Sequence, residues 1–325
     1  MKYTPAKIKM WARMGQRGAL FGVAMPDIAE RKDHVKLLTA DLTLLSGMER
    51  YAKKYPDKFL NVGIAEQNMI GVAAGLAMDG YCVFASTYAS FIAVRSLEQV
   101  RQNLAHMRCN VKLVGSSAGT ASAKSGISHW ATEDLAFIRA LPNLTVLSPA
   151  DSLEAVKAAE WAADMEGPVY IRLSGGLSCP IVYEEDYDFV PGKLVELRAG
   201  EEVAVITTGL MVSESLQAAA LLEERGISCA VYNMHTIKPI DKEGLREIFA
   251  RFRLVVTVEE HMVTGGLGSA VAEFKATLPN TPRQVFLGFQ DAFCEAGTQR
   301  YVWEQAGLTD AQIVEHIQKE WEREA

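Results

Sequence analysis

Short apolar runs that alternate with longer helical segments constrain the fold of this chain more than any other feature. In the first half, runs of β-branched residues and leucine predict strands at Val35–Thr39, Phe59–Val62, Tyr81–Ser86, Val111–Gly115, Leu144–Ser148 and Val169–Leu173. Runs that are apolar at nearly every position are typical of strands buried on both faces. Between two of them, Glu66–Asp79 repeats apolar residues every three or four positions, as a core-facing helix does. We therefore expect an α/β fold in which helices cover a parallel sheet.

A change of composition between residues 177 and 200 divides the chain into two domains. This stretch combines glycines and prolines with the acidic run Glu184–Asp188, which predicts a linker. Beyond it the alternation resumes, with strands expected at Val203–Thr207, Ser228–Tyr232, Leu254–Val258 and Gln284–Leu287. We therefore predict a parallel-sheet domain over residues 1–176, a linker over 177–200 and a smaller α/β domain over 201–325. The first 32 residues are expected to pack as helix against the first domain.

Charge and cysteine usage exclude several classes of protein. The chain has 33 lysines and arginines against 40 acidic residues, a net charge of −7, which is not the basic footprint of a nucleic-acid binder. No apolar run approaches the ~18 residues of a membrane-spanning helix. The five cysteines are scattered and predict neither a disulfide framework nor a metal site. The N-terminus lacks the apolar stretch of a secretory signal, so we expect a cytoplasmic protein.

A glycine-rich segment, Thr264–Gly268, lies between a predicted strand and a predicted helix. Phosphate groups bind at such places in α/β proteins, because the first N–H groups of a helix are free. The segment matches neither Gly-x-Gly-x-x-Gly nor the P-loop pattern. A tight turn from strand to helix is therefore the favoured interpretation.

Four side chains that follow predicted strands of the first domain are candidates for a binding site. They are Glu66, Tyr88, Phe91 and His129. Each also has an ordinary explanation: a carboxylate stabilises a helix start, an aromatic pair packs in a core, and a loop histidine is solvated. Their position favours a site, because ligands bind at the carboxyl ends of strands in open α/β sheets.

Further motifs, taken in order, give the chain a resemblance to a known family. The segments that carry it are Thr39–Leu42 with Asp41, Val62–Asn68, Ala73–Ala77, Ser86–Phe91, Leu141–Asn143, Ser148–Asp151, Gly167–Arg172, Asn233–Asp241, Glu259–His261 and Gly265–Ala270. Each is short, but together they cover nearly the whole chain. The chain resembles the C-terminal half of a transketolase, in the form that is split into two polypeptides.

The resemblance implies a division of the cofactor site between two chains. In this family the first domain binds the pyrimidine end of thiamine diphosphate, and the last is the smaller C-terminal domain. A further domain binds the diphosphate through Mg²⁺ and carries a Gly-Asp-Gly signature. This chain has no Gly-Asp-Gly, since Met78-Asp79-Gly80 is a different sequence. A partner chain, the N-terminal, diphosphate-binding half of the transketolase, is therefore expected to supply that part of the site and the Mg²⁺ in an α2β2 assembly.

The same resemblance gives the candidate side chains their roles. It implies that Glu66 hydrogen-bonds the N1′ atom of the aminopyrimidine, which requires a dry site that favours a protonated carboxyl group. Tyr88 and Phe91 would stack on the aminopyrimidine, and Asp41 would lie near the cofactor from the other side. His129 matches the histidine that contacts the hydroxyls of the donor sugar. The implied reaction moves a two-carbon ketol unit from a ketose to an aldose.

The substrate end departs from the family pattern. The loop before the histidine usually reads Glu-Asp-Gly-x-Thr-His, and here Ser125 replaces the aspartate that contacts the donor. An arginine that holds the substrate phosphate in most relatives is missing from Ser174–Gly176. Arg17, Ser46 and Arg172 remain as candidates for binding an anionic tail, although Arg172 could equally be an ordinary strand-end residue. We therefore expect a specialised sugar phosphate or sulfonate as substrate.

Three other functions stay open at this point. The beta subunit of a thiamine-dependent oxoacid dehydrogenase shares the Ala-Glu-Gln helix start and the split architecture. Deoxyxylulose-phosphate synthase shares several motifs but is normally about twice as long. A partner subunit without catalytic activity would tolerate the change at Ser125, whereas the retained Glu66 and His129 argue against it.

Overall fold

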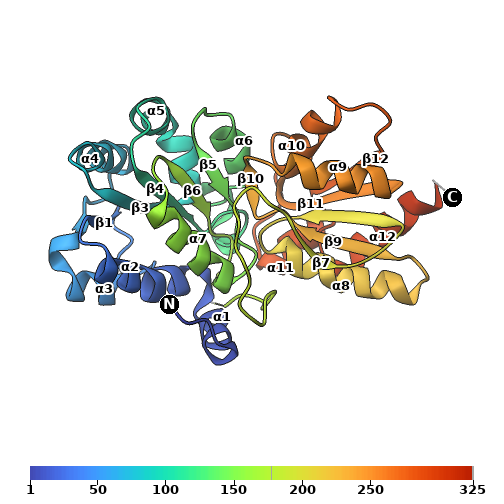
Figure 1. The fold of residues 1–325 in the computed structure, drawn as a ribbon, viewed down its shortest axis with the longest axis horizontal. Coiled ribbons are helices and arrows are strands. Elements are labelled where there is room, and N and C mark those ends of the chain that lie inside the picture. The colour runs from blue at the N-terminus through green and yellow to red at the C-terminus, as the bar shows by residue number, and fades with distance from the viewer. Residues whose placement is uncertain (177, 324–325) are drawn as a thin grey trace.

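The computed structural model, which describes residues 1–176 and 178–323, contains two α/β domains side by side (Figure 1). Within these residues, seven strands form one sheet in the order β10-β5-β6-β4-β3-β1-β2, and five form another in the order β12-β11-β8-β9-β7. All neighbouring strands are parallel except at one edge of each sheet, where β10 runs antiparallel to β5 and β7 antiparallel to β9. The predicted fold class, parallel sheets covered by helices, is confirmed.

The first sheet has helices on both faces. Its strands are β1 (Val35–Thr39), β2 (Phe59–Asn61), β3 (Cys82–Tyr88), β4 (Val111–Ser116), β5 (Thr145–Leu147), β6 (Val169–Arg172) and β10 (Thr236–Lys238). One face packs on α1 (Pro5–Ala19), α2 (Met25–Arg31) and α7 (Ser152–Asp164). The other packs on α4 (Glu66–Met78), α5 (Leu97–Gln99) and α6 (Asp134–Arg139). The expectation that the first 32 residues pack as helix against this domain is confirmed, while α3 (Glu49–Lys54) lies beside β2.

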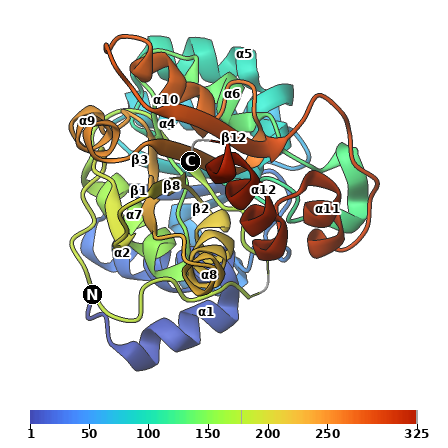
Figure 2. The same cartoon turned by 90° about the vertical axis from the view of Figure 1, so that its right-hand side faces the viewer.

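The second sheet repeats this arrangement on a smaller scale. Its strands are β7 (Val195–Arg198), β8 (Val203–Thr207), β9 (Cys229–Asn233), β11 (Leu254–Met262) and β12 (Arg283–Phe289). Helices α8 (Met211–Glu224) and α12 (Asp310–Glu322) pack together on one face, as Figure 2 shows. Helices α9 (Lys242–Arg251) and α10 (Leu267–Lys275) cover the other face. Helix α11 (Gln299–Ala306) contacts a loop of the first domain.

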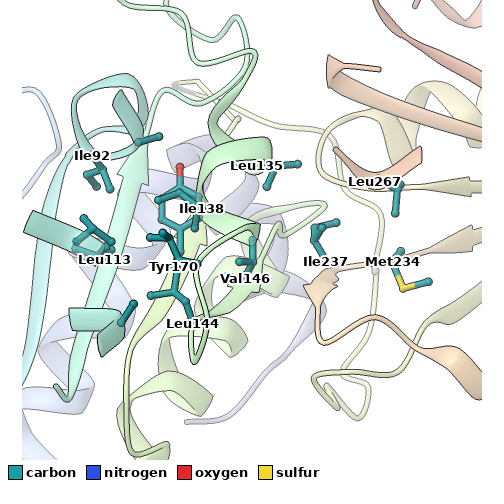
Figure 3. Packing of buried hydrophobic residues seen from close by; sticks show 14 of the residues in the cluster. Ile92, Leu113, Leu135, Ile138, Leu144, Val146, Tyr170, Met234, Ile237 and Leu267 are labelled. Carbon is teal, nitrogen blue, oxygen red and sulfur yellow. The ribbon is translucent and has the colours of Figure 1, made fainter. Parts of the chain in front are cut away.

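One buried apolar cluster connects the two sheets. Figure 3 shows Ile92 and Leu113 of the first domain in the same cluster as Met234, Ile237 and Leu267 from the second half of the chain. Burial of apolar surface is the main favourable term in folding, so a shared core stabilises the two domains against each other. No helix in the described part of the chain is long and apolar enough to cross a membrane.

Two strands differ from the sequence-based expectations. Strand β7 lies inside the stretch predicted as a linker (177–200, of which residue 177 is outside the described residues) and pairs with β9. Strand β10 belongs by sequence to the second domain, yet it extends the first sheet by pairing with β5. Both are short edge strands, and β7 carries the charged Glu196 and Arg198. Edge strands of this kind lack the continuous apolar run that reveals a buried strand.

Candidate functional site

Glu66 begins helix α4 a few residues after strand β2 ends. Its side chain is buried, with the residue only 5% exposed. Its Oε1 atom accepts a hydrogen bond of 2.8 Å from Nη1 of Arg95. A carboxylate in the first turn of a helix is also stabilised by the helix dipole. Glu66 is thus a buried acid whose only hydrogen-bond partner among the described residues is one arginine.

That arginine lies on the face of an aromatic ring. The guanidinium carbon of Arg95 is 3.9 Å from the centroid of the Phe91 ring. Phe91–Arg95 form a π-helical turn, in which the N–H of Ser96 donates to the carbonyl of Phe91. Single π-helical turns occur frequently at functional sites. The side chain of Arg95 is still 47% exposed, so one side of this contact opens to solvent.

Tyr88, Phe91 and His129 form a cluster of three rings, which we call the aromatic triad. The centroids of Tyr88 and Phe91 are 5.6 Å apart with the rings nearly perpendicular. The imidazole of His129 lies 5.3 Å from the Tyr88 ring and 5.7 Å from the Phe91 ring. Its Nδ1 atom is 2.8 Å from the hydroxyl of Ser128. These distances and tilts are those of favourable edge-to-face packing.

The topology of the first sheet explains why these side chains meet. Strands β4, β3, β1 and β2 are consecutive neighbours and run parallel, so their carboxyl ends share one edge. Tyr88 is the last residue of β3, Glu66 follows β2, and His129 is on the loop after β4. This edge is the usual ligand site of open α/β sheets.

Asp41 follows β1 at the same edge and is exposed. Its backbone has a positive φ of 57°, a conformation that aspartate tolerates better than most residues. Its carboxylate accepts a hydrogen bond of 3.0 Å from the amide of Asn61, and its backbone N–H donates one of 3.0 Å to Oδ1 of the same asparagine. The structure therefore places Asp41 beside the end of β2.

The residues predicted to bind substrate lie in different surroundings. Burial lowers the pKa of Arg17, and the charge of the Tyr88 phenol opposes this shift. Ser46 is buried, and its hydroxyl has no hydrogen-bond partner among the described residues. Ser125 is exposed in the loop that also carries His129. Unpartnered buried hydroxyls are uncommon, so Ser46 has bonding capacity to offer.

Arg172 does not fit the predicted contact with substrate. The residue is 1% exposed, and its Nε atom donates hydrogen bonds to both carboxylate oxygens of Asp134, at 3.0 and 2.9 Å. Its Nη2 atom donates to the carbonyls of Ala131 and Glu260. A guanidinium with these internal acceptors holds the fold together, so of the two interpretations that the sequence left open, the structure favours an ordinary strand-end residue over a substrate ligand.

The N–H groups of the glycine-rich turn at 264–268 are already bonded by a side chain of the same domain. The backbone N–H groups of Leu267 and Gly268, at the start of α10, donate to the carboxylate of Glu259 at 2.7 and 2.8 Å. A Cβ atom on Gly266 would lie 2.0 Å from that carboxylate, so only glycine fits there. The chain's own acid occupies the place where a phosphate would bind, in agreement with the favoured interpretation as a tight turn.

Sequence reasoning missed Arg95. The signal was its position four residues after Phe91, a spacing that brings two helical side chains together. An isolated arginine on a helix is usually solvated, so the sequence gives no reason to connect it with Glu66, 29 positions earlier. Among the described residues, the structure contains no group of three or more His, Cys, Asp or Glu that could hold a metal ion.

Comparison with known proteins agrees with this architecture. Residues 16–179 match the model of the transketolase pyrimidine-binding domain, and residues 192–313 match that of the transketolase C-terminal domain. A putative transketolase C-terminal section from Methanocaldococcus jannaschii is 37% identical over 94% of this chain and 96% of its own length. The 6-deoxy-6-sulfo-D-fructose transketolase subunit SqwH from Clostridium sp. is 39% identical over 91% of this chain and 92% of its own length.

A solved structure gives the same result. A structure described as split gene transketolase, inactive beta4 tetramer, superposes with a TM-score of 0.86 at 41% identity, and covers 94% of this chain and 98% of that one. The similarity to these proteins therefore extends over both domains and both chain lengths. The chain belongs to the transketolase family and corresponds to its C-terminal half, a pyrimidine-binding domain followed by the transketolase C-terminal domain.

Proposed function

We propose that the chain is the C-terminal component of a two-component transketolase, which moves a two-carbon ketol unit from a ketose donor to an aldose acceptor. The observation that carries the proposal is the buried Glu66 at the start of α4. Its partner Arg95 also lies over the Phe91 ring of the aromatic triad, and so connects the acid with the rings. The relatives that match this chain over nearly their whole length are named as a section or a subunit of a transketolase, which supports the two-component form.

The residues present fit the aminopyrimidine of thiamine diphosphate. Glu66 offers a buried carboxyl group with one oxygen free of hydrogen bonds among the described residues. Phe91 offers a ring face that already accepts a flat cationic group, the guanidinium of Arg95. An aminopyrimidine is likewise flat and has nitrogen atoms that can bond a carboxyl group. In this proposal Glu66, Tyr88 and Phe91 hold the pyrimidine, and Asp41 lies at the neighbouring strand end.

In the mechanism that we propose, thiamine diphosphate supplies the carbon nucleophile and the electron sink for carbon–carbon bond cleavage. Glu66, in its protonated form, donates a hydrogen bond to a pyrimidine nitrogen. Tyr88 and Phe91 fix the plane of the ring and exclude water from it. His129 bonds the hydroxyls of the ketose, because its loop lies directly against the two rings.

Arg95 must leave Glu66 before this can happen. An ion pair with a guanidinium requires the ionised carboxylate, whereas donation to a ring nitrogen requires the protonated carboxyl group. Arg95 also covers the face of Phe91 that a pyrimidine would use. We infer that the chain alone binds the cofactor weakly and that Arg95 is displaced when the assembled site closes.

We propose that a partner chain, the N-terminal half of the transketolase, supplies the diphosphate site and the Mg²⁺ ion in an α2β2 assembly. The name of the solved relative, an inactive tetramer of β chains, supports the need for a partner. Cβ atoms placed on Gly71 and Gly75 of α4 would meet nothing within 4 Å, so another backbone could approach this helix closely. All five cysteines are free, which fits the reducing cytoplasm that the proposal includes.

The proposed substrate is a sugar with an anionic tail, either phosphate or sulfonate. Arg17 provides a positive charge that interacts with Tyr88, and Ser46 and Ser125 add hydroxyls. One relative is named for a sulfonated sugar, 6-deoxy-6-sulfo-D-fructose. With Arg172 buried in the fold, Arg17 is left as the arginine of this set that can recognise the tail.

The test is co-purification with the product of the adjacent gene, followed by a screen of ketose donors with phosphate, sulfonate or neutral tails. We expect thiamine-dependent ketol transfer only when both chains are present, and only from donors with an anionic tail. Cleavage of no ketose by the assembled complex would argue for a non-catalytic protein. A preference for xylulose phosphate and ribose phosphate over every other donor would argue against a specialised substrate.

A further inference from the structure

The loop that carries Ser125 and His129 is closed at its base. Gly119 and Ala131 form an antiparallel bridge, in which each N–H donates to the other carbonyl at 3.0 and 2.9 Å. Within the loop, the indole N–H of Trp130 donates to the carbonyl of Ala123 at 3.3 Å. Residues 119–131, which we call the His129 loop, therefore behave as one unit that must be held at its base.

The C-terminal domain holds that base through Glu260, near the end of β11. This residue is 2% exposed, and its Oε1 atom accepts hydrogen bonds from both the backbone N–H and the hydroxyl of Thr120. The same oxygen accepts from the indole of Trp303 at 2.8 Å and from the amide of Gln299 at 3.0 Å. One carboxylate thus joins the first domain to helix α11.

The packing at this place is equally close. A Cβ atom on Gly119 would lie 2.6 Å from the carboxylate of Glu260, so the loop backbone lies directly on the acid. Ala123 and Trp130 belong to the buried cluster formed by α8 and α12 of the C-terminal domain. The backbone N–H of Met262 donates to the carbonyl of Thr132 at 2.7 Å. The loop is therefore part of the second domain's core, although its sequence lies in the first domain.

The same loop reaches the proposed active site through His129, two residues before Ala131. His129 contacts the rings of Tyr88 and Phe91, which belong to the first domain. The C-terminal domain thus holds the Gly119 side of the loop base through Glu260, Arg172 of the first domain bonds Ala131, and His129 lies directly beside this base. Because misplacement of a catalytic group by about 1 Å can cost about 10²-fold in rate, the base determines whether His129 is in position.

We propose that Glu260 is a positioning residue for ketol transfer, which acts through Thr120 and the His129 loop to hold His129 against the aromatic triad. This inference rests on the proposed function and extends it, because it gives the C-terminal domain a part in donor binding. Glu260 itself touches no reacting atom. Its effect is exerted entirely through the placement of His129.

The test compares single and double variants of the two-component complex. Glu260→Gln keeps Oε1 but removes the charge that strengthens its four hydrogen bonds, and it places an amide where the unpartnered Oε2 lies. We expect it to lower kcat/KM for the donor about tenfold, mostly through the donor KM, with the acceptor KM unchanged. The double variant Glu260→Gln/His129→Ala should lose no more than His129→Ala alone, because both changes remove the same contact. Independent effects would multiply, and this result would overturn the inference.

Glu214→Gln is the matched control. Glu214 is also a buried acid of the C-terminal domain, but its carboxylate accepts hydrogen bonds from the backbone N–H of Asp310 and from Arg300, neither of which belongs to the His129 loop. We expect Glu214→Gln to reduce stability without a selective change in donor KM. Any effect that it has on kcat/KM should multiply with the effect of His129→Ala. If Glu260→Gln does not fold, Thr120→Val removes the hydroxyl from the other side of the contact, and its double variant with His129→Ala decides the question in the same way.

Hydrogen exchange on the chain without its partner separates this inference from the proposed function. We expect the amides of residues 119–131 to exchange at least several-fold faster in Glu260→Gln than in the wild type. In Glu214→Gln their exchange rates should be unchanged. If exchange in the isolated chain is faster but the assembled complex transfers no ketol unit, the proposed function is contradicted and the loop contact stands. Unchanged exchange in the Glu260 variant would overturn the positioning role even if the complex is an active transketolase.

Discussion

Glu66 and Glu259 occupy related places in the two domains, with opposite surroundings. Each is a buried acid near the carboxyl end of a parallel strand and near the start of a helix. Glu259 is bonded by two backbone N–H groups of α10, and glycine at 266 lets the turn close over it. Glu66 is bonded by a single side chain, that of the half-exposed Arg95. Backbone donors cannot leave an acid without unfolding the turn, whereas a side chain can.

The neighbour of Glu259 completes the closed arrangement. Burial lowers the pKa of His261 to about 4, so its ring is neutral at pH 7 and forms no ion pair with Glu259. Its Nδ1–H donates to the carbonyl of Met262 at 2.7 Å, and its Nε2 accepts from the N–H of Ala136 at 3.3 Å. Both ring nitrogens of this histidine therefore have a hydrogen-bond partner. The second domain therefore uses this strand end for structure, whereas in the proposed function the corresponding strand end of the first domain serves the chemistry.

The largest expected effect is that of Glu66→Gln. In the assembled complex we expect turnover to fall about 10²- to 10³-fold, because glutamine cannot supply the carboxyl proton that the proposed role requires. Melting temperature should stay within about 2 °C of the wild type, since the amide still fits the site. Steady-state kinetics and calorimetry measure both. If Glu66→Gln is about as active as the wild type, Glu66 has no part in the mechanism. The functional contrast between Glu66 and Glu259 then fails as well.

Glu259→Gln tests the closed side of the comparison. Burial raises the pKa of Glu259 to about 7, despite two N–H groups that oppose this shift. The folded chain therefore holds the proton more tightly than the unfolded chain between pH 4.5 and about 7. The stability that this group contributes is complete below pH 4.5 and is lost as the pH rises through 7, by roughly 3 kcal/mol at most.

In the glutamine variant this pH dependence should disappear, and one N–H of α10 should lose its acceptor. We expect the free energy of unfolding to fall by about 1–3 kcal/mol at pH 5, with a flatter profile from pH 5 to 8. Denaturant titrations across that range measure both quantities. Glu273→Gln, on the exposed side of α10, is the matched control. A variant as stable as the wild type would mean that the turn does not depend on this acid.

His129→Ala is expected to have a smaller effect that is confined to the donor half-reaction. Loss of one or two hydrogen bonds to the ketose corresponds to about a tenfold lower kcat/KM for the donor. The acceptor kinetics should change little, because they depend on other contacts. Separate titration of donor and acceptor measures the two values. Unchanged donor kinetics would take His129 out of the site, although its ring lies against Tyr88 and Phe91.

The comparison also explains which parts could be predicted from the sequence. The buried strands were found because each is a continuous apolar run, and Glu66 was found because it lies in a family motif after such a run. The role of Arg172 was left open between substrate ligand and strand-end residue, because its partner, Asp134, lies 38 positions earlier in the chain. Glu260 and Thr120 are 140 positions apart. Contacts of this range depend on how the two domains pack, and a local pattern of residues does not contain that information.

The smallest expected effect concerns Arg95, the half-exposed side-chain partner of Glu66. Arg95→Ala removes the group that competes with a pyrimidine for the acid and for the face of Phe91. A half-exposed ion pair contributes about 0.2–1 kcal/mol, so the assembled complex should bind thiamine diphosphate with Mg²⁺ about two- to fivefold more tightly in this variant. Isothermal calorimetry measures the change. Arg101→Ala is the matched control, because Arg101 forms an exposed ion pair with Glu98. If binding is weaker in Arg95→Ala and unchanged in Arg101→Ala, Arg95 helps to bind the cofactor and does not compete with it. The contrast between a displaceable partner of Glu66 and the fixed partners of Glu259 would then fail.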